Sequence, residues 1–111
     1  MAAKPIIWIG SSLDDLRNFP EEARSRAGYQ LHRIQQGLMP SDWKPIPSLG
    51  SGVLEIRIHT GRQHRVFYIA KFEEAIYVLH AFEKKTQQTA KRDLAVARKR
   101  LAFVIRNRSQ G

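Results

Sequence analysis

The chain has 111 residues, enough for one domain with a hydrophobic core and too few for two, so we expect one domain over residues 1–111. Its 19 Lys and Arg against 10 Asp and Glu give a net charge of +9, which favours phosphate-rich partners. The absence of cysteine excludes disulfides, a thiol nucleophile and a thiolate zinc site.

No apolar run approaches the roughly 20 residues that cross a bilayer. The first ten residues, MAAKPIIWIG, also lack the longer apolar core of a secretory signal. We therefore expect a soluble, cytoplasmic protein without a membrane partner.

The chain is expected to begin with a strand and a short helix. Residues 6–9 form a short β-branched run between a proline and a glycine, which is typical of a strand. Ser11 or Ser12 is expected to cap the helix that follows, with Asp14 or Asp15 reaching back in a capping box.

A second helix is expected to begin at Pro20 and run to about Gln36, where Gly37 can end it. Apolar residues recur at helical spacing along it. This expected inner stripe consists of Ala23, Ala27, Leu31, Ile34 and Leu38. The two helices should form a hairpin.

Residues 37–52 contain three prolines and three glycines, so we expect a loop without regular structure. A loop of this length usually packs or functions. Met39, Trp43, Ile46 and Leu49 can fix it across the core, and a Trp43 that grips substrate is the alternative.

Three strands are expected next, at residues 53–58, 64–71 and 75–82. Their short connections indicate an antiparallel meander. The last two are apolar on both faces, so they should lie in the centre of the sheet.

The chain should end in a helix over residues 89–106. Its expected core stripe is Leu94, Ala97, Leu101, Val104 and Ile105. The element order is then β-α-α-β-β-β-α, an α+β fold with a mainly antiparallel sheet, an N-terminal helical hairpin and a C-terminal helix.

Several chemistries are not expected. The four histidines are scattered without a helical pair or clustered carboxylates, and we predict no metal or other cofactor, although His59 and His64 flank a turn and can approach each other. The chain has no Gly-x-Ser-x-Gly elbow and no phosphate-binding P-loop.

A basic, hydrogen-bonding set remains on or near the expected sheet. It consists of Arg57, His59, Arg65, Tyr68, His80, Lys84 and Lys85. Cations on adjacent strands can grip a phosphodiester and stabilise the transition state of 2′-hydroxyl attack, and His, Tyr or Lys can move protons. Each has a structural alternative, such as a core tyrosine at Tyr68 or a satisfied core histidine at His80, and none is singled out as the general base.

The last 32 residues carry +7 of the net charge, since nine basic residues oppose two acidic ones there. The expected C-terminal helix holds most of these cations, among them Lys91, Arg92, Arg98 and Lys99. An outer helix face with so few acids favours binding to RNA or to an acidic protein over a merely solvated surface.

Two segments carry a family resemblance: Arg-Val-x-Tyr at 65–68 and Val-Leu-His-x-Phe-x-Lys-Lys-Thr-Gln at 78–87. With them, nearly the whole chain resembles the phage-derived, HigB-like branch of the RelE/ParE toxin superfamily. The resemblance implies a type II toxin that enters the ribosome and cleaves mRNA. It also implies a microbial ribonuclease-like fold.

The resemblance further implies a cognate helix-turn-helix antitoxin, HigA-like, with the toxin alone as a monomer or within a toxin-antitoxin hetero-oligomer. Arg65 then corresponds to a phosphate-contacting arginine, Lys84 or Lys85 to a strand-end cation that assists the reaction, and Arg57 to a further basic strand position. We expect a metal-independent endoribonuclease that inhibits translation. The alternatives are a ParE-like gyrase poison and a non-catalytic RNA- or protein-binding module.

Overall fold

The computed structural model describes residues 3–110 as three helices and five strands. In chain order these are β1 (Ile6–Trp8), α1 (Ser12–Arg17), α2 (Glu21–Gln35), β2 (Trp43–Pro45), β3 (Val53–His59), β4 (Gln63–Ile69), β5 (Ile76–Glu83) and α3 (Lys91–Gln110). The α+β class is confirmed, and the predicted element order is confirmed except for the additional strand β2.

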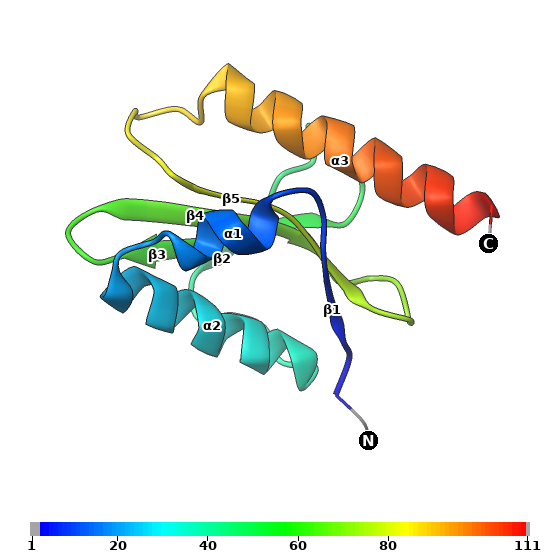
Figure 1. Ribbon diagram of the computed structural model, residues 1–111, viewed down its shortest axis with the longest axis horizontal. Helices are drawn as coiled ribbons and strands as arrows, with labels where there is room; N and C mark the ends of the chain where they lie inside the picture. Colours follow the sequence, from blue (N-terminus) through cyan, green and yellow to red (C-terminus); the bar gives the residue numbers. More distant parts are fainter. Residues whose placement is uncertain (1–2, 111) are drawn as a thin grey trace.

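The five strands form one sheet in the order β1-β5-β4-β3-β2 (Figure 1). β1 pairs with β5 in parallel, and the other neighbours pair antiparallel. The prediction that the two most apolar strands are central is confirmed, because β4 and β5 each have a strand on both sides.

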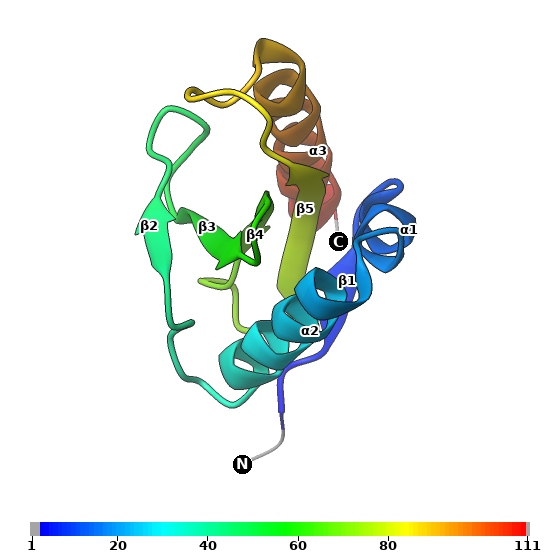
Figure 2. The same ribbon diagram turned by 90° about the vertical axis from the view of Figure 1, so that its left-hand side faces the viewer.

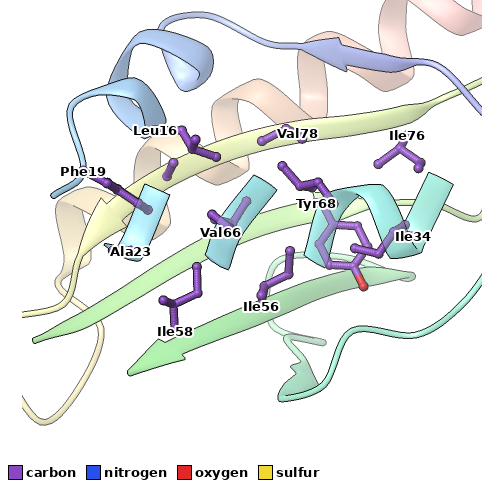
Figure 3. Close-up of a cluster of buried hydrophobic side chains, with 13 residues drawn as sticks. Leu16, Phe19, Ala23, Ile34, Ile56, Ile58, Val66, Tyr68, Ile76 and Val78 are labelled. Atoms are coloured by element: carbon purple, nitrogen blue, oxygen red, sulfur yellow. The ribbon is translucent and has the colours of Figure 1, made fainter. Parts of the chain in front are cut away.

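The helices cover opposite faces of the sheet (Figure 2). α1 and α2 lie on one face, where the predicted stripe of α2 is buried from Ala23 to Ile34. Figure 3 shows Ile34 from α2 with Ile56, Val66 and Tyr68 from β3 and β4 in this core. Leu38 was expected to extend the stripe but is 51% exposed, because the chain has already turned away.

Gly37 ends α2 as predicted. It adopts a φ of 84°, a left-handed conformation that costs glycine little. The amide of Gly37 donates to Ile34 O at 3.0 Å and that of Leu38 to Arg33 O at 3.0 Å, the hydrogen-bond pattern of a Schellman cap.

α3 covers part of the opposite face. Ala97 and Val104 are buried against β5, and Leu94 and Leu101 pack beside them. The prediction that Ile105 joins this stripe is wrong, since Ile105 is 47% exposed. The reason is geometric: Ile105 is about 100° around the helix from Val104, on its flank.

The N-terminal capping box was also predicted wrongly. Ser11 Oγ donates to the Asp15 side chain at 2.8 Å instead of accepting from a backbone amide. Ser12 Oγ donates to Val78 O at 3.1 Å and is fully buried, so its hydroxyl joins α1 to β5. Sequence spacing alone does not distinguish these partners.

The segment 37–52 is not wholly irregular, because β2 adds to the edge of the sheet. Lys44 lies opposite Glu55 in β3. Leu49 is buried and Ile46 packs on the core as expected, but Met39 and Trp43 are 45% and 39% exposed. No helix within residues 3–110 is long and apolar enough to cross a membrane.

Candidate nucleic-acid interface

The candidate site lies on the α3 face of the sheet, beyond the part that α3 covers. Successive strand residues point to opposite faces. Val53, on the face of β3 that packs toward α3, therefore shares that face with Glu55 and Arg57. Arg65 of β4 lies directly opposite Arg57, so strand register brings two arginines side by side.

A buried ion pair forms the floor of this site. Arg65 Nε lies 3.7 Å from Glu55 Oε2, and their side chains are 3% and 2% exposed. Arg65 Nη1 also donates to His64 O at 3.0 Å. Burial raises the pKa of the Glu55 carboxyl above its ordinary value of 4.5, while Arg65 opposes that rise.

Further cations surround the pair. Lys44, Lys84 and Arg57 all act electrostatically on Glu55, together with Arg65. Burial and then the charge of Arg65 lower the pKa of the Lys84 amine. Four cations are thus concentrated around one carboxylate, which leaves a positive excess at this end of the sheet.

The cations differ in access. Lys44 and Lys85 are exposed and Arg57 and Lys84 are half-buried, whereas Arg65 is buried. Within residues 3–110, the buried Nε of Arg57 has no hydrogen-bond partner. The accessible cations can contact a phosphate, and the Glu55–Arg65 ion pair lies buried beneath them.

The sequence of the chain was compared with those of known proteins. The model of a family described as phage-derived, Gp49-like proteins (DUF891) matches residues 14–102. The chain belongs to the Gp49-like family. No curated protein sequence matches it significantly.

His80 of this Gp49-like protein lies next to the site but is engaged. Its Nε2 is 2.8 Å from Asp93 Oδ1, and both side chains are largely buried. Its ring stacks on Phe82 with a centroid distance of 4.9 Å. His80 therefore joins β5 to the first turn of α3, the structural role that the sequence left open.

Tyr68 and His59 were predicted with the cation set, and the structure separates Tyr68 from it. Tyr68 is 1% exposed in the core under α2, on the other face of the sheet (Figure 3). Burial there raises its pKa to about 12, which disfavours a role in proton transfer. His59 lies at the end of β3, where it lines a pocket together with Arg57 and Asp42, and its Nε2 is 2.9 Å from Asp42 Oδ2.

His59 and His64 do not approach each other, because His64 faces the α2 side, where its ring lies 4.4 Å from that of Phe19. Among residues 3–110, no group of three or more His, Asp and Glu is arranged to hold a metal ion.

The predicted RNA-binding cations of α3 are exposed but do not share one flank. These are Lys91, Arg92, Arg98 and Lys99. Lys99 lines a cavity with Val96 on the side of β1. Arg98 is about 200° around the helix from Val96, on the flank toward the cation site.

The sequence reasoning missed Glu55 and Lys44. Glu55 was taken as an outward residue of an alternating strand, which is correct only when that face meets solvent. Lys44 was placed in an irregular loop. The available signal was the pairing of one acid with basic residues on the same strand face, Glu55 with Arg57.

Proposed function

We propose that this Gp49-like protein is the toxin of a type II toxin-antitoxin system and cleaves mRNA on the ribosome. The observation that carries the proposal is the concentration of Lys44, Arg57, Arg65 and Lys84 around the buried carboxylate of Glu55. Buried ion pairs are seldom worth their desolvation for stability alone, so a functional reason for this one is favoured. The resemblance to HigB-like toxins, and through them to the RelE/ParE superfamily, also supports a toxin that cleaves mRNA.

The proposed chemistry is an internal transfer within the RNA. The 2′-hydroxyl loses its proton to water as its oxygen attacks the adjacent phosphorus, the P–O5′ bond breaks, and the departing 5′-oxygen takes up a proton. The products are a 2′,3′-cyclic phosphate and a free 5′-hydroxyl. Arg57 and Lys84 neutralise the charge that builds on the phosphate oxygens. This stabilisation makes the proposed reaction independent of a metal ion.

Lys84 has a second role in the proposal. Because its pKa is lowered, its amine loses and regains a proton more readily near neutral pH than an exposed lysine. It is therefore our candidate for delivering a proton to the departing 5′-oxygen. Glu55 and Arg65 act beneath it as positioning residues, and Lys85 adds phosphate binding at the rim.

One observation is also compatible with a second candidate function. The floor residues Glu55 and Arg65 are almost inaccessible, which suits a binding surface without chemistry as well as a catalytic one. A gyrase poison of the ParE type would bind a protein target in this way.

Induction of the wild type and of Lys84→Ala/Lys85→Ala in one host separates these functions. We expect growth arrest and codon-positioned mRNA cuts by primer extension for the wild type. Loss of one charge-stabilising contact typically costs about 100- to 1,000-fold in rate, so the double variant should allow growth.

The matched control is Arg24→Ala/Lys71→Ala, which removes the same charge from exposed positions outside the cation site. It should arrest growth like the wild type. Intact mRNA together with broken DNA would contradict the ribonuclease and support a gyrase poison. Normal growth in all three cultures would show that the protein is not a toxin.

A further inference from the structure

A groove runs between β1 and α3, along the part of α3 from Val96 to Arg108. Two adjoining cavities of about 510 and 440 Å³ form it, and both are lined by Ile9 and Phe103. Ile7 of β1 contributes to the first cavity and Val96 of α3 to the second. The groove is therefore predominantly apolar along its length.

The apolar side chains of the groove are open to solvent. Phe103 is 50% exposed and Ile7 is 41% exposed. Single exposed apolar residues are common on protein surfaces, whereas apolar side chains gathered along one groove are typical of an interaction site. The arrangement resembles the hydrophobic grooves that receive a helix from another protein.

The charge around the groove selects the kind of partner. α3 carries seven Lys and Arg and one Asp. Three cations, Lys99, Arg100 and Arg108, line the cavities against one acid, Glu74. A second copy of this chain carries the same net charge of +9 and would present the same cations, so self-association is disfavoured.

RNA is also a poor fit. A nucleic-acid backbone is bound by a row of accessible cations, and bases stack on aromatic side chains held between such cations. In the groove, Arg100 is already engaged with Leu79 O at 2.9 Å and Arg108 with Glu74. We propose that the groove between β1 and α3 binds an acidic, amphipathic helix of a protein partner.

The dimensions agree with that partner. The lining residues of α3 extend from Val96 to Arg108, a rise of about 18 Å at 1.5 Å per residue. A partner helix of about 12 residues spans this distance and presents apolar residues at i, i+3, i+4 and i+7. Acidic residues beside that stripe meet Lys99, which is exposed.

The groove and the cation site lie on opposite flanks of α3. Figure 2 shows α3 above β5, with β1 on one side and β3 and β2 on the other. A helix in the groove thus occupies the β1 side and leaves Arg57 and Lys84 uncovered. The partner is thereby held on the protein without filling the proposed RNA site.

The test uses the purified full chain and a fluorescein-labelled peptide of about 14 residues, with leucines at the four anchor positions and glutamates beside them. Fluorescence anisotropy should show saturable binding, and the peptide's circular dichroism should become more helical. A scrambled peptide of equal charge should bind at least about tenfold more weakly.

Two matched pairs of variants locate the site. Phe103→Asp places a charge in the groove and should weaken binding at least about tenfold, whereas Ile105→Asp, an equally exposed position on the other flank, should not. Lys99→Glu should weaken binding more than Arg98→Glu. Amide signals of Ile7 and Phe103 should shift in NMR spectra on addition of peptide.

The proposal is overturned if the scrambled peptide binds equally, if Phe103→Asp binds like the wild type, or if no saturable binding occurs. Light scattering that shows a dimer lost in Phe103→Asp would assign the groove to a second copy instead. The assay needs no RNA cleavage, so its result is independent of the proposed ribonuclease activity.

Discussion

The two faces of the central sheet are covered unequally. Under α1 and α2, the strands present Ile56, Ile58 and Val66 to a continuous apolar core. Under α3, the core formed around Phe67 and Leu79 gives way to Glu55 and the arginines beside it. One face of the sheet is covered by a continuous apolar core, which stabilises the fold. The other face is only partly covered by α3, and its remaining part carries charged side chains.

Two neighbours in β3 make the comparison direct. Ile56 is 0% exposed and Glu55 is 1% exposed, so adjacent residues are buried to the same depth on opposite faces. An apolar side chain gains from burial, whereas an ionised carboxyl loses its hydration. The same depth should therefore have opposite consequences for the free energy of unfolding.

The largest effect is expected for Ile56→Ala. Deleting this side chain leaves a cavity between β3 and α2 and should lower the free energy of unfolding by about 2–5 kcal/mol. Urea denaturation followed by tryptophan fluorescence measures it. Ile105→Ala, on an exposed position of α3, should stay within about 0.5 kcal/mol of the wild type. Equal losses in both variants would contradict the assignment of stability to the α2 face.

Glu55→Gln should gain stability relative to the wild type as pH rises from acidic to neutral values. The pKa of Glu55 is higher in the folded state than its ordinary value of 4.5, so folding binds a proton between these two values. The stability due to Glu55 is fully present below pH 4.5 and is lost as pH rises through the folded-state pKa. Glutamine does not ionise, so the variant escapes this loss.

The measurement is the urea midpoint of both proteins from acidic to neutral pH. The variant should gain on the wild type as pH rises above 4.5, and parallel curves would show that Glu55 is not the titrating group. Glu73→Gln, at an exposed carboxyl, is the control. Because Glu55 raises the pKa of Lys84, the variant should also move the pH profile of any RNA cleavage to lower pH.

The sequence predicted the elements whose pattern repeats over several turns or strand positions. The stripe of α2 and the alternation in residues 53–58 gave the helix, the strand and the inward side chains of the α2 core. The parallel pairing of β1 with β5 joins residues about 70 positions apart, Ile6 with Ile76, and no local pattern specifies it.

The wrong predictions for Tyr68 and Glu55 arose because each strand was interpreted without knowing which helix covers each of its faces. Tyr68 has the same strand parity as Val66, so its position in the α2 core was readable once the inward face of β4 was known. Glu55 alternates with Leu54 and Ile56 and resembles a solvent-facing residue. Glu55 becomes a buried charge only because α3 and the segment before β3 cover its face of the sheet.

The smallest effect is expected at Glu74, which has the same side chain as Glu55 at the other end of the α3 face. Hydrogen bonds from Arg108 first, and then from Tyr77, lower the pKa of Glu74 to about 2. A lowered pKa has the opposite effect on the pH dependence of stability. The stability due to Glu74 is present above the ordinary value of 4.5 and is lost as pH falls through about 2.

Glu74→Gln should therefore lower the urea midpoint slightly at neutral pH, by less than Ile56→Ala, because Glu74 is exposed and its ion pair is weakened by water and salt. The difference from the wild type should vanish near pH 2 and shrink at about 1 M salt, where charges are screened within about 3 Å. Since folding raises the pKa of Glu55 and lowers that of Glu74, Glu55→Gln should gain and Glu74→Gln should lose stability relative to the wild type over the same rise in pH. A shared direction would mean that burial does not separate the two carboxyls, and the unequal cover of the sheet would no longer explain their chemistry.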